Sequence, residues 1–250
     1  GKDKVITNPP TYGMYKVSAN INNIKVDEVL LTPDFQLQTE QILNRVTDFT
    51  KLIFVCSPNN PTANDMDRKD INYDGLVVVD EAYIDFSEQA GFAEEVKNYP
   101  NLVVLQTLSK AFGLAGIRLG IAIANPDIIN YMMKVKAPYN VNKLTSQAAL
   151  NGFENLESVQ KNIGSINSEK NRIVAKLENL AQVEKVFPSD ANFLLFRVDD
   201  ALNVYKKLAD SGVIVRYRGN EPHCENCLRM TIGTTQENDQ FLSSLIKILG

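Results

Sequence analysis

The sequence predicts an α/β fold with a mostly parallel sheet, followed by a smaller α+β domain. Short apolar runs alternate with helical patterns through the first half, and this order is typical of a parallel sheet. Several runs are continuous, such as Leu76–Val79, which indicates strands buried on both faces between helices. The pattern changes after about Asn142. We therefore expect a large domain over residues 1–142 and a small C-terminal domain, with a long connecting helix, over residues 143–250.

The expected elements follow from the period of the apolar residues. In the first half the expected strands are Lys4–Thr7, Ile24–Leu31, Leu52–Cys56, Leu76–Asp80, Leu102–Gln106 and Arg118–Ala124. The expected helices there are Tyr12–Ala19, Thr39–Val46, Glu88–Asn98 and Pro126–Lys136. In the second half we expect helical residues 143–180 with a break near 152–156, and helices at 201–211 and 236–249. Strands are expected there at 183–187, 192–198, 213–216 and 227–232.

The composition limits the function classes. Lys and Arg total 26 against 30 for Asp and Glu, a net charge of −4, which argues against a general nucleic-acid binder. No apolar stretch is long enough to span a bilayer. The 3 cysteines do not suggest a disulfide framework and fit a reducing cytosol. Cys224 and Cys227 have the spacing of half a zinc site, but no second pair exists, so we expect no metal.

The most informative segment runs from Thr107 to Arg118 (TLSKAFGLAGIR). It follows an expected strand, and open α/β sheets place their sites at the carboxyl ends of strands. The hydroxyls of Thr107 and Ser109 and the guanidinium of Arg118 suit a phosphate. Lys110 lies between them, and a lysine that is buried or close to other cations becomes a nucleophile that forms Schiff bases. The alternative is a solvated surface lysine, which the small, apolar and hydroxylated neighbours disfavour.

Asp80 ends another apolar strand, and Tyr83 follows it at the same end of the sheet. A carboxylate at such a point can pair with a protonated ring nitrogen of a cofactor. The same residue could instead cap the helix after the strand, because Asp is a common N-cap. On this segment alone, the cap and the site are equally open interpretations.

Two stiff turns complete the set. In Cys56–Thr62 (CSPNNPT), two prolines make a rigid turn that would hold the Asn60 amide in a fixed pose. In Pro9–Tyr15 (PPTYGMY), an aromatic residue follows a stiff turn and could lie against a flat ring. A plain turn and an ordinary tyrosine are the alternatives. The four segments fall at the ends of successive strands, and their joint order carries more weight than any one of them.

Two other nucleotide-binding interpretations lack their motifs. The strand Val77–Val79 with Asp80 and Glu81 is similar to the acidic strand of P-loop ATPases, but no G-x-x-x-x-G-K-[ST] string occurs. The glycines at 113, 116 and 120 do not match the dinucleotide-binding pattern G-x-G-x-x-G. Neither a P-loop nor a dinucleotide-binding fold is therefore expected.

Together these segments resemble the fold-type I pyridoxal-phosphate (PLP) enzymes, and within them the branch of class II aminotransferases that contains histidinol-phosphate aminotransferase. The similar stretches are PPTYGMY, SPNNPT, VDEAYIDF, TLSKAF, LAGIR and LRMTIGT, which lie along essentially the whole chain. The resemblance implies a mostly parallel sheet of the seven-stranded type between helices. It also implies a PLP-dependent transaminase of histidine biosynthesis, cytoplasmic and homodimeric, that passes an amino group between histidinol phosphate and 2-oxoglutarate.

The resemblance also implies roles for individual residues. Lys110 would hold the cofactor covalently and shuttle a proton, Asp80 would pair with the ring nitrogen, and Tyr83 would complete the catalytic set. The cofactor contacts would be Tyr12 on the ring, Asn60 and Tyr83 on the phenolic oxygen, and Thr107, Ser109 and Arg118 on the phosphate. Arg229 and Arg216 would bind the acidic end of the substrate, with Arg218 as a competitor of Arg216.

Two departures from the family pattern affect these expectations. Ala63 stands where the family usually has glycine after Asn-Pro-Thr. Family members also carry further residues before the point that matches Gly1, so we expect an N-terminally truncated chain that binds PLP poorly or is inactive. The alternatives that stay open are an aromatic or other amino-acid aminotransferase, a related decarboxylase, and a non-catalytic truncated remnant.

Overall fold

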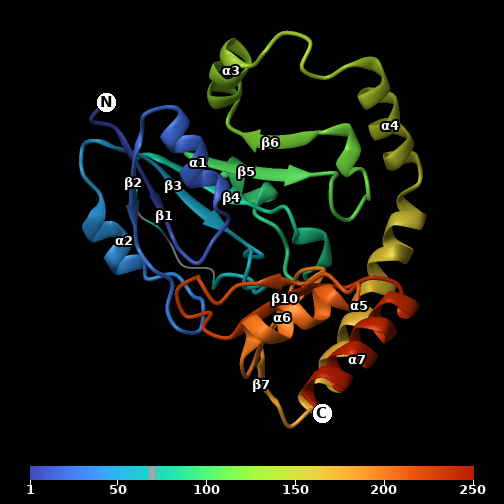
Figure 1. Ribbon diagram of the computed structural model, residues 1–250. Helices are drawn as coiled ribbons and strands as arrows, with labels where there is room; N and C mark the ends of the chain where they lie inside the picture. Colours follow the sequence, from blue (N-terminus) through green and yellow to red (C-terminus); the bar gives the residue numbers. More distant parts are fainter. Residues whose placement is uncertain (68–70, 72) are drawn as a thin grey trace.

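The computed structural model describes residues 1–67, 71 and 73–250. It contains two sheets, one of six strands and one of four. Figure 1 shows the six-stranded sheet in the upper half and the second sheet, with helices α5, α6 and α7, below it. Helices α4 (Lys143–Glu154) and α5 (Leu156–Glu178) descend along one side and connect the two halves.

The larger sheet has the order β2-β1-β3-β4-β5-β6. Pairs from β2 to β5 are parallel, and β6 is antiparallel to β5. The expected mostly parallel sheet is confirmed, with six strands in the described part of the chain rather than the seven of the implied type. The strands are β1 (Lys4–Thr7), β2 (Lys25–Glu28), β3 (Thr50–Cys56), β4 (Leu76–Asp80), β5 (Leu102–Thr107) and β6 (Gly120–Ala124).

The continuous apolar runs are central strands, as their composition predicts. Ile53 in β3 and Val104 in β5 are fully buried, and Val78 and Val79 in β4 are nearly so although they point to opposite faces. Three helices accompany this sheet: α1 (Met14–Ile21), α2 (Thr39–Arg45) and α3 (Pro126–Val135). α1 packs against β1 and β2, and α3 packs against β6.

The second sheet is antiparallel throughout and has the order β7-β8-β10-β9. Its strands are β7 (Val183–Val186), β8 (Phe193–Val198), β9 (Arg216–Tyr217) and β10 (Cys227–Thr231). Helices α6 (Ala201–Asp210) and α7 (Thr235–Leu249) pack with α5 over a core that includes Ile173, Leu194 and Leu245. A capping box of Thr234 and Glu237 starts α7 and satisfies two backbone donors there.

The helix expected at Glu88–Asn98 is wrong. Only two short 3₁₀ turns form in this region, Ile84–Phe86 and Ala93–Lys97. The buried Glu81 carboxylate accepts hydrogen bonds from the backbone N–H of Phe92 and, at 2.9 Å, from Gln106. A β-carbon at Gly91 would come within 2.8 Å of the same carboxylate. A tertiary contact therefore fixes this backbone in a turn, against its local helical pattern.

Two expected strands are displaced. The strand expected from Arg118 begins at Gly120, because Arg118 has a left-handed backbone with φ 54°. The strand expected at 213–216 forms as the two-residue β9, Arg216–Tyr217. The break in the long helical segment is confirmed, since α4 ends at Glu154 and α5 begins at Leu156. The division into domains at residues 142 and 143 stays a prediction.

Ala63 lies where the two halves of the molecule meet. Its carbonyl accepts from the N–H of Asp190 at 2.8 Å, and the Asp190 carboxylate accepts from the N–H of Asp65 at 2.8 Å. Ala63 is fully buried and has φ 72°, a left-handed conformation that favours glycine. The position where the family usually has glycine thus has the backbone that glycine adopts most easily.

Replacing Ala63 with glycine should change the free energy of unfolding by less than about 1 kcal/mol. Relief of left-handed strain is worth about 1–2 kcal/mol. It is offset by the lost burial of one methyl, about 0.8 kcal/mol, and by the greater freedom of glycine in the unfolded chain, about 0.4–1 kcal/mol. Ala63→Val should instead cost about 3 kcal/mol or more, because a branched side chain adds overpacking to the strain. Urea unfolding measures both changes, and an Ala63→Val protein as stable as the parent would contradict this account.

Candidate active site

A cavity of about 770 Å³ opens at the carboxyl ends of β3, β4 and β5. Its lining includes nine of the ten residues that the sequence singled out: Tyr12, Asn60, Asp80, Tyr83, Thr107, Ser109, Lys110, Arg118 and Arg229. The tenth, Arg216, is not among the lining residues, whereas its competitor Arg218 is. Segments far apart in the sequence therefore meet in one hollow.

Strand register explains the convergence. Cys56 pairs with Asp80 in the ladder of β3 and β4, and Asp80 pairs with Leu105 in the ladder of β4 and β5. Because these strands are parallel, the residues that follow each of them emerge at the same edge of the sheet. Asn60, Tyr83 and Lys110 follow β3, β4 and β5 by a few residues each.

Asp80 is held from two sides. Its Oδ2 accepts a hydrogen bond from the Tyr15 hydroxyl at 2.6 Å, and its Oδ1 accepts from the N–H of Ala82 at 3.1 Å. Burial raises the pKa of Asp80, while the hydrogen bonds from Tyr15 and Ala82 and the charge of Lys110 lower it. The bond to Ala82 is a local turn contact and not a helix cap, because the short 3₁₀ helix after β4 has Tyr83 at its N-cap position.

The ammonium group of Lys110 lies 5.1 Å from the centre of the Tyr83 ring. Tyr83 is buried, and its ring meets Phe193 of β8 edge-on, with 5.0 Å between centroids. Burial raises the pKa of Tyr83, and the positive charge of Arg229 opposes this. The phenol therefore stays protonated at neutral pH and can donate to an oxygen in the cavity.

The hydroxyls at the end of β5 form a compact group. Thr107 and Ser109 place their side-chain oxygens 2.9 Å apart, and the N–H of Ser109 donates to Thr107 Oγ1 at 3.1 Å. Arg118 lines the same cavity and donates from Nη1 to the carbonyl of Ala115 at 2.8 Å. Two hydroxyls and a guanidinium at one place can together bind a phosphate.

The arginines come from the second sheet. Arg229 on β10 donates from Nη1 to Asn60 Oδ1 at 2.5 Å, and its guanidinium carbon lies 4.8 Å from the centre of the Phe193 ring. Burial and the charge of Arg218 lower the pKa of Arg229. In the described part of the chain, the buried Nε atoms of Arg218 and Arg229 have no hydrogen-bond partner. Unpaired buried donors are costly, which favours an anionic ligand at this point.

The structure changes the expectation about Arg216. Arg216 pairs with Arg229 across β9 and β10, but it is exposed at the outer edge of the sheet and does not line the cavity. Arg218 lies two residues further toward the cavity, and its N–H donates to the carbonyl of Cys227 at 2.9 Å. Of the two competitors, Arg218 is the better placed to meet a ligand.

Sequence reasoning missed Asn59 and Tyr15. Asn59 is fully buried and ties the two stiff turns together: its amide donates to the Pro10 carbonyl at 2.8 Å and to Thr62 Oγ1 at 2.7 Å, and its Oδ1 accepts from Thr11 at 3.0 Å. The paired asparagines were the available signal. Tyr15 lies three residues after Tyr12, but only the structure shows that its hydroxyl reaches Asp80.

These groups fit PLP. The lining offers an amine (Lys110), a carboxylate (Asp80), a phenol and an amide (Tyr83, Asn60) and phosphate donors, and the unpaired arginine nitrogens add sites for an anion.

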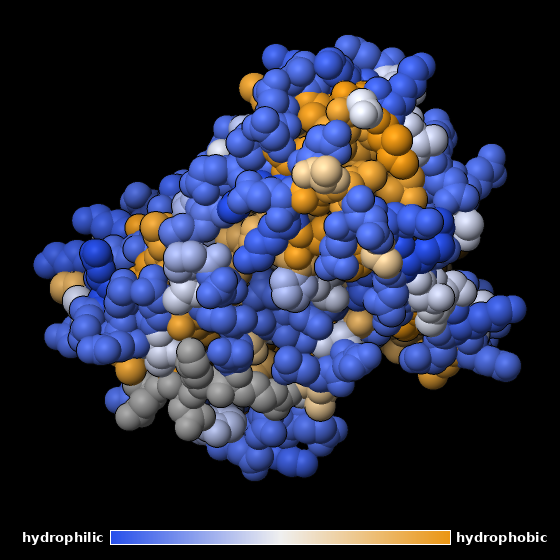
Figure 2. Space-filling view, turned by 90° about the horizontal axis from the view of Figure 1, so that it is seen from below, coloured by the Kyte–Doolittle hydropathy of each residue, from blue (hydrophilic) through white to orange (hydrophobic). Residues whose placement is uncertain are grey.

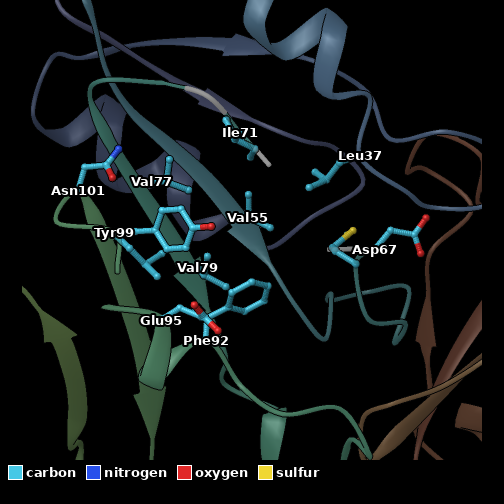
Figure 3. Close-up of a pocket in the computed structure, with 12 residues that line it drawn as sticks. Leu37, Val55, Asp67, Ile71, Val77, Val79, Phe92, Glu95, Tyr99 and Asn101 are labelled. Atoms are coloured by element: carbon cyan, nitrogen blue, oxygen red, sulfur yellow. The ribbon is translucent and has the colours of Figure 1, made fainter. Parts of the chain in front are cut away.

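A second pocket, of about 260 Å³, lies against β3 and β4 and is lined by Val55, Val77, Val79, Phe92 and Tyr99 among others (Figure 3). No lysine or arginine is among its described lining residues, so we assign the chemistry to the larger cavity.

Comparison with known proteins identifies the family. The sequence pattern of the family described as aminotransferase class I and II matches residues 1–245. The chain is 50% identical over 249 residues to the histidinol-phosphate aminotransferase of Flavobacterium johnsoniae. The matched region covers 98% of this chain and 71% of that protein. This chain belongs to the PLP-dependent class I and II aminotransferases, in the histidinol-phosphate aminotransferase branch. A further relative with the same description, from Bacteroides fragilis, is 44% identical and covers 99% of this chain and 73% of its own length.

Solved structures agree with this aminotransferase in fold. The histidinol-phosphate aminotransferase of Clostridium acetobutylicum has a TM-score of 0.92 at 23% identity and covers 99% of this chain and 78% of its own. That of Sinorhizobium meliloti, in complex with pyridoxal-5′-phosphate, has a TM-score of 0.86 at 20% identity and covers 99% of this chain and 70% of its own. No helix in the described ranges of this aminotransferase is long and apolar enough to cross a membrane.

Asn59 provides a test of how the cavity is built. Asn59→Ala should lower the free energy of unfolding by about 2–4 kcal/mol, because it leaves buried groups of both turns without partners. Asn60→Ala should cost less, since its side chain is half-buried and can be replaced by water. Chemical denaturation of the two variants side by side gives the comparison. Equal losses would mean that Asn59 does not tie the turns together.

Proposed function

We propose that this chain transfers the amino group between histidinol phosphate and 2-oxoglutarate with PLP held at Lys110. The observation that carries the proposal is the meeting of Lys110, Asp80 and a group of phosphate donors in one cavity. The family and the names of its relatives supply the substrate, and the arginines at the cavity are the feature of this chain that fits it.

The residues divide the work by chemistry. PLP, when bound, supplies an aldehyde for the amino group and a ring that accepts electrons. The amine of Lys110 would bind that aldehyde. It would also carry the proton that moves between the substrate Cα and the cofactor carbon C4′. Asp80 would keep the ring nitrogen protonated, and Asn60 and Tyr83 would hold the phenolic oxygen. Tyr12, which is exposed at 43%, would cover the ring face, and Thr107, Ser109 and Arg118 would bind the phosphate.

The substrate would enter from the side of the second sheet. Arg229 and Arg218 both present a buried, unpaired Nε, and a guanidinium binds a phosphate or a carboxylate through two parallel hydrogen bonds. Both substrates carry such a group, so one pair of arginines can serve each half of a two-step exchange. Arg216 would contribute only longer-range charge from the exposed edge.

The chain would act as a homodimer in the cytoplasm. Its three cysteines are free, which is typical of a reducing compartment. Figure 2 shows a broad hydrophobic area on the face seen from below. Large exposed apolar side chains also occur along α1, α3 and α4, among them Ile21, Val135 and Leu144. Such surfaces mark interaction sites. Sedimentation velocity at several concentrations measures the oligomeric state, and a chain that is monomeric at all of them would contradict the proposed homodimer.

Lys110→Ala should abolish transamination, because it removes the amine that holds the cofactor. It should also abolish saturable PLP binding, which is measured by absorbance in the visible band. Lys206→Ala, on the exposed face of α6, is the matched control and should behave as the parent. Histidinol phosphate and phenylalanine are offered as amino donors with 2-oxoglutarate. Turnover with phenylalanine alone would indicate an aromatic aminotransferase, and a parent chain that binds no PLP would indicate a non-catalytic remnant.

Arg218→Ala should raise KM for histidinol phosphate by about 10- to 100-fold, since a hydrogen bond to a charged group is lost at the acidic end of the substrate. Arg216→Ala should raise it less than about threefold at physiological salt, because screening weakens an exposed charge. Steady-state kinetics of both variants decide between the two arginines. A larger effect at Arg216 would reverse the assignment.

A further inference from the structure

The hydrogen bond between Tyr15 and Asp80 joins two elements that are distant in the sequence. Tyr15 lies in the first turn of α1, and Asp80 is the last residue of β4. The Tyr15 ring stacks on Phe54 of β3, with 4.8 Å between centroids and 8° between planes, and it is 7% exposed. The stacked ring fixes where the hydroxyl points, and it points at Asp80 Oδ2 from 2.6 Å.

Packing alone does not account for this hydroxyl. A phenylalanine would stack on Phe54 equally well, and a buried hydroxyl costs free energy unless it is hydrogen-bonded. Here its partner is a carboxylate, and hydrogen bonds to charged groups are the strong ones. Burial, with the neighbouring Cys56 and Asp80, raises the pKa of Tyr15, so the hydroxyl stays a donor.

We propose that Tyr15 is a positioning residue that holds the Asp80 carboxylate in place for the ring nitrogen of the cofactor. The inference rests on the proposed function, because it assigns Asp80 to that nitrogen. An ionised carboxylate has about four acceptor sites. The donors Tyr15 and Ala82 engage one site on each oxygen and leave others for an N–H in the cavity.

The titratable groups around Asp80 come from four elements. Tyr15 lies on α1, Cys56 ends β3, Tyr83 follows β4 and Lys110 follows β5. Burial raises the pKa of Cys56 to about 12, so its thiol is neutral. Tyr83 is protonated as well, which leaves Lys110 as the one cation in this group. The hydrogen bond from Tyr15 and the charge of Lys110 both favour the ionised carboxylate against the effect of burial.

The sign of the pH effect follows from these groups. Burial raises the pKa of Asp80 above its ordinary value, and the Tyr15 hydrogen bond lowers it. Removing that bond therefore raises the pKa of Asp80 further. As the solution is acidified, Asp80 then becomes protonated at a higher pH than in the parent. A protonated Asp80 has lost the negative charge that stabilises a protonated ring nitrogen, so its hydrogen bond to that nitrogen is weaker. PLP affinity in Tyr15→Phe should thus begin to fall at a higher pH than in the parent.

The first measurement needs no cofactor. In protein labelled with ¹³C at the aspartate carboxyl groups, the Asp80 resonance is identified by its loss in Asp80→Asn, and its titration is followed by NMR. Its midpoint should move to higher pH in Tyr15→Phe. The matched control is Tyr73→Phe, which also removes one phenolic hydrogen bond, to the Thr50 carbonyl at 2.6 Å, outside the cavity. An unmoved midpoint in Tyr15→Phe would overturn the proposal.

The second measurement is the dissociation constant of PLP against pH for the same proteins. Tyr15→Phe should bind PLP about 10- to 100-fold more weakly at neutral pH, and Tyr73→Phe should bind as the parent does. Parental affinity at every pH in Tyr15→Phe would refute the positioning role even if the midpoint of Asp80 moves. A parent chain that binds no PLP would refute the proposed function and the cofactor half of this inference, while the NMR result would still decide whether Tyr15 controls Asp80.

Discussion

The parallel register of β3, β4 and β5 is the constraint on which the site depends. Because Cys56, Asp80 and Leu105 stand side by side in the ladder, the three segments that follow them leave the sheet at one edge. A slip of the register by one residue would turn every side chain of a strand to the opposite face of the sheet, so the packing on both faces would have to change. The relative positions of Asn60, Asp80 and Lys110 are therefore set by the hydrophobic core rather than by contacts among the three polar groups.

A second layer of structure fixes the directions of these side chains. Asn59 ties the turn at Pro10 to the turn at Thr62, and Tyr15 does the same for α1 and the end of β4. Both use buried polar groups with defined partners, which are expensive to break. Groups outside the direct chemistry thus determine how well the reacting groups are oriented.

Much of the sheet and of the candidate site could be predicted from the sequence, because the ends of the apolar strands are visible in it. The apolar run before Asp80 and the run before Lys110 place both residues at the carboxyl edge, and the structure confirms the strands.

The choice between Arg216 and Arg218 could not be made, since it depends on where the two-residue β9 begins, and so short a strand has no periodicity to read. The helix expected at 88–98 failed for a related reason: the buried Glu81 carboxylate, distant in the local pattern, bonds the backbone of Phe92. The link from Tyr15 to Asp80 spans 65 positions and has no local signal.

The contact of Arg229 with Asn60 connects the two sheets through a single side chain at a distance of 2.5 Å. One guanidinium faces both the amide at the end of β3 and the open space where an anion would lie. An anion that draws this guanidinium toward itself also shifts the electrical surroundings of the amide on the other side. The substrate side and the cofactor side of the cavity would therefore share one guanidinium.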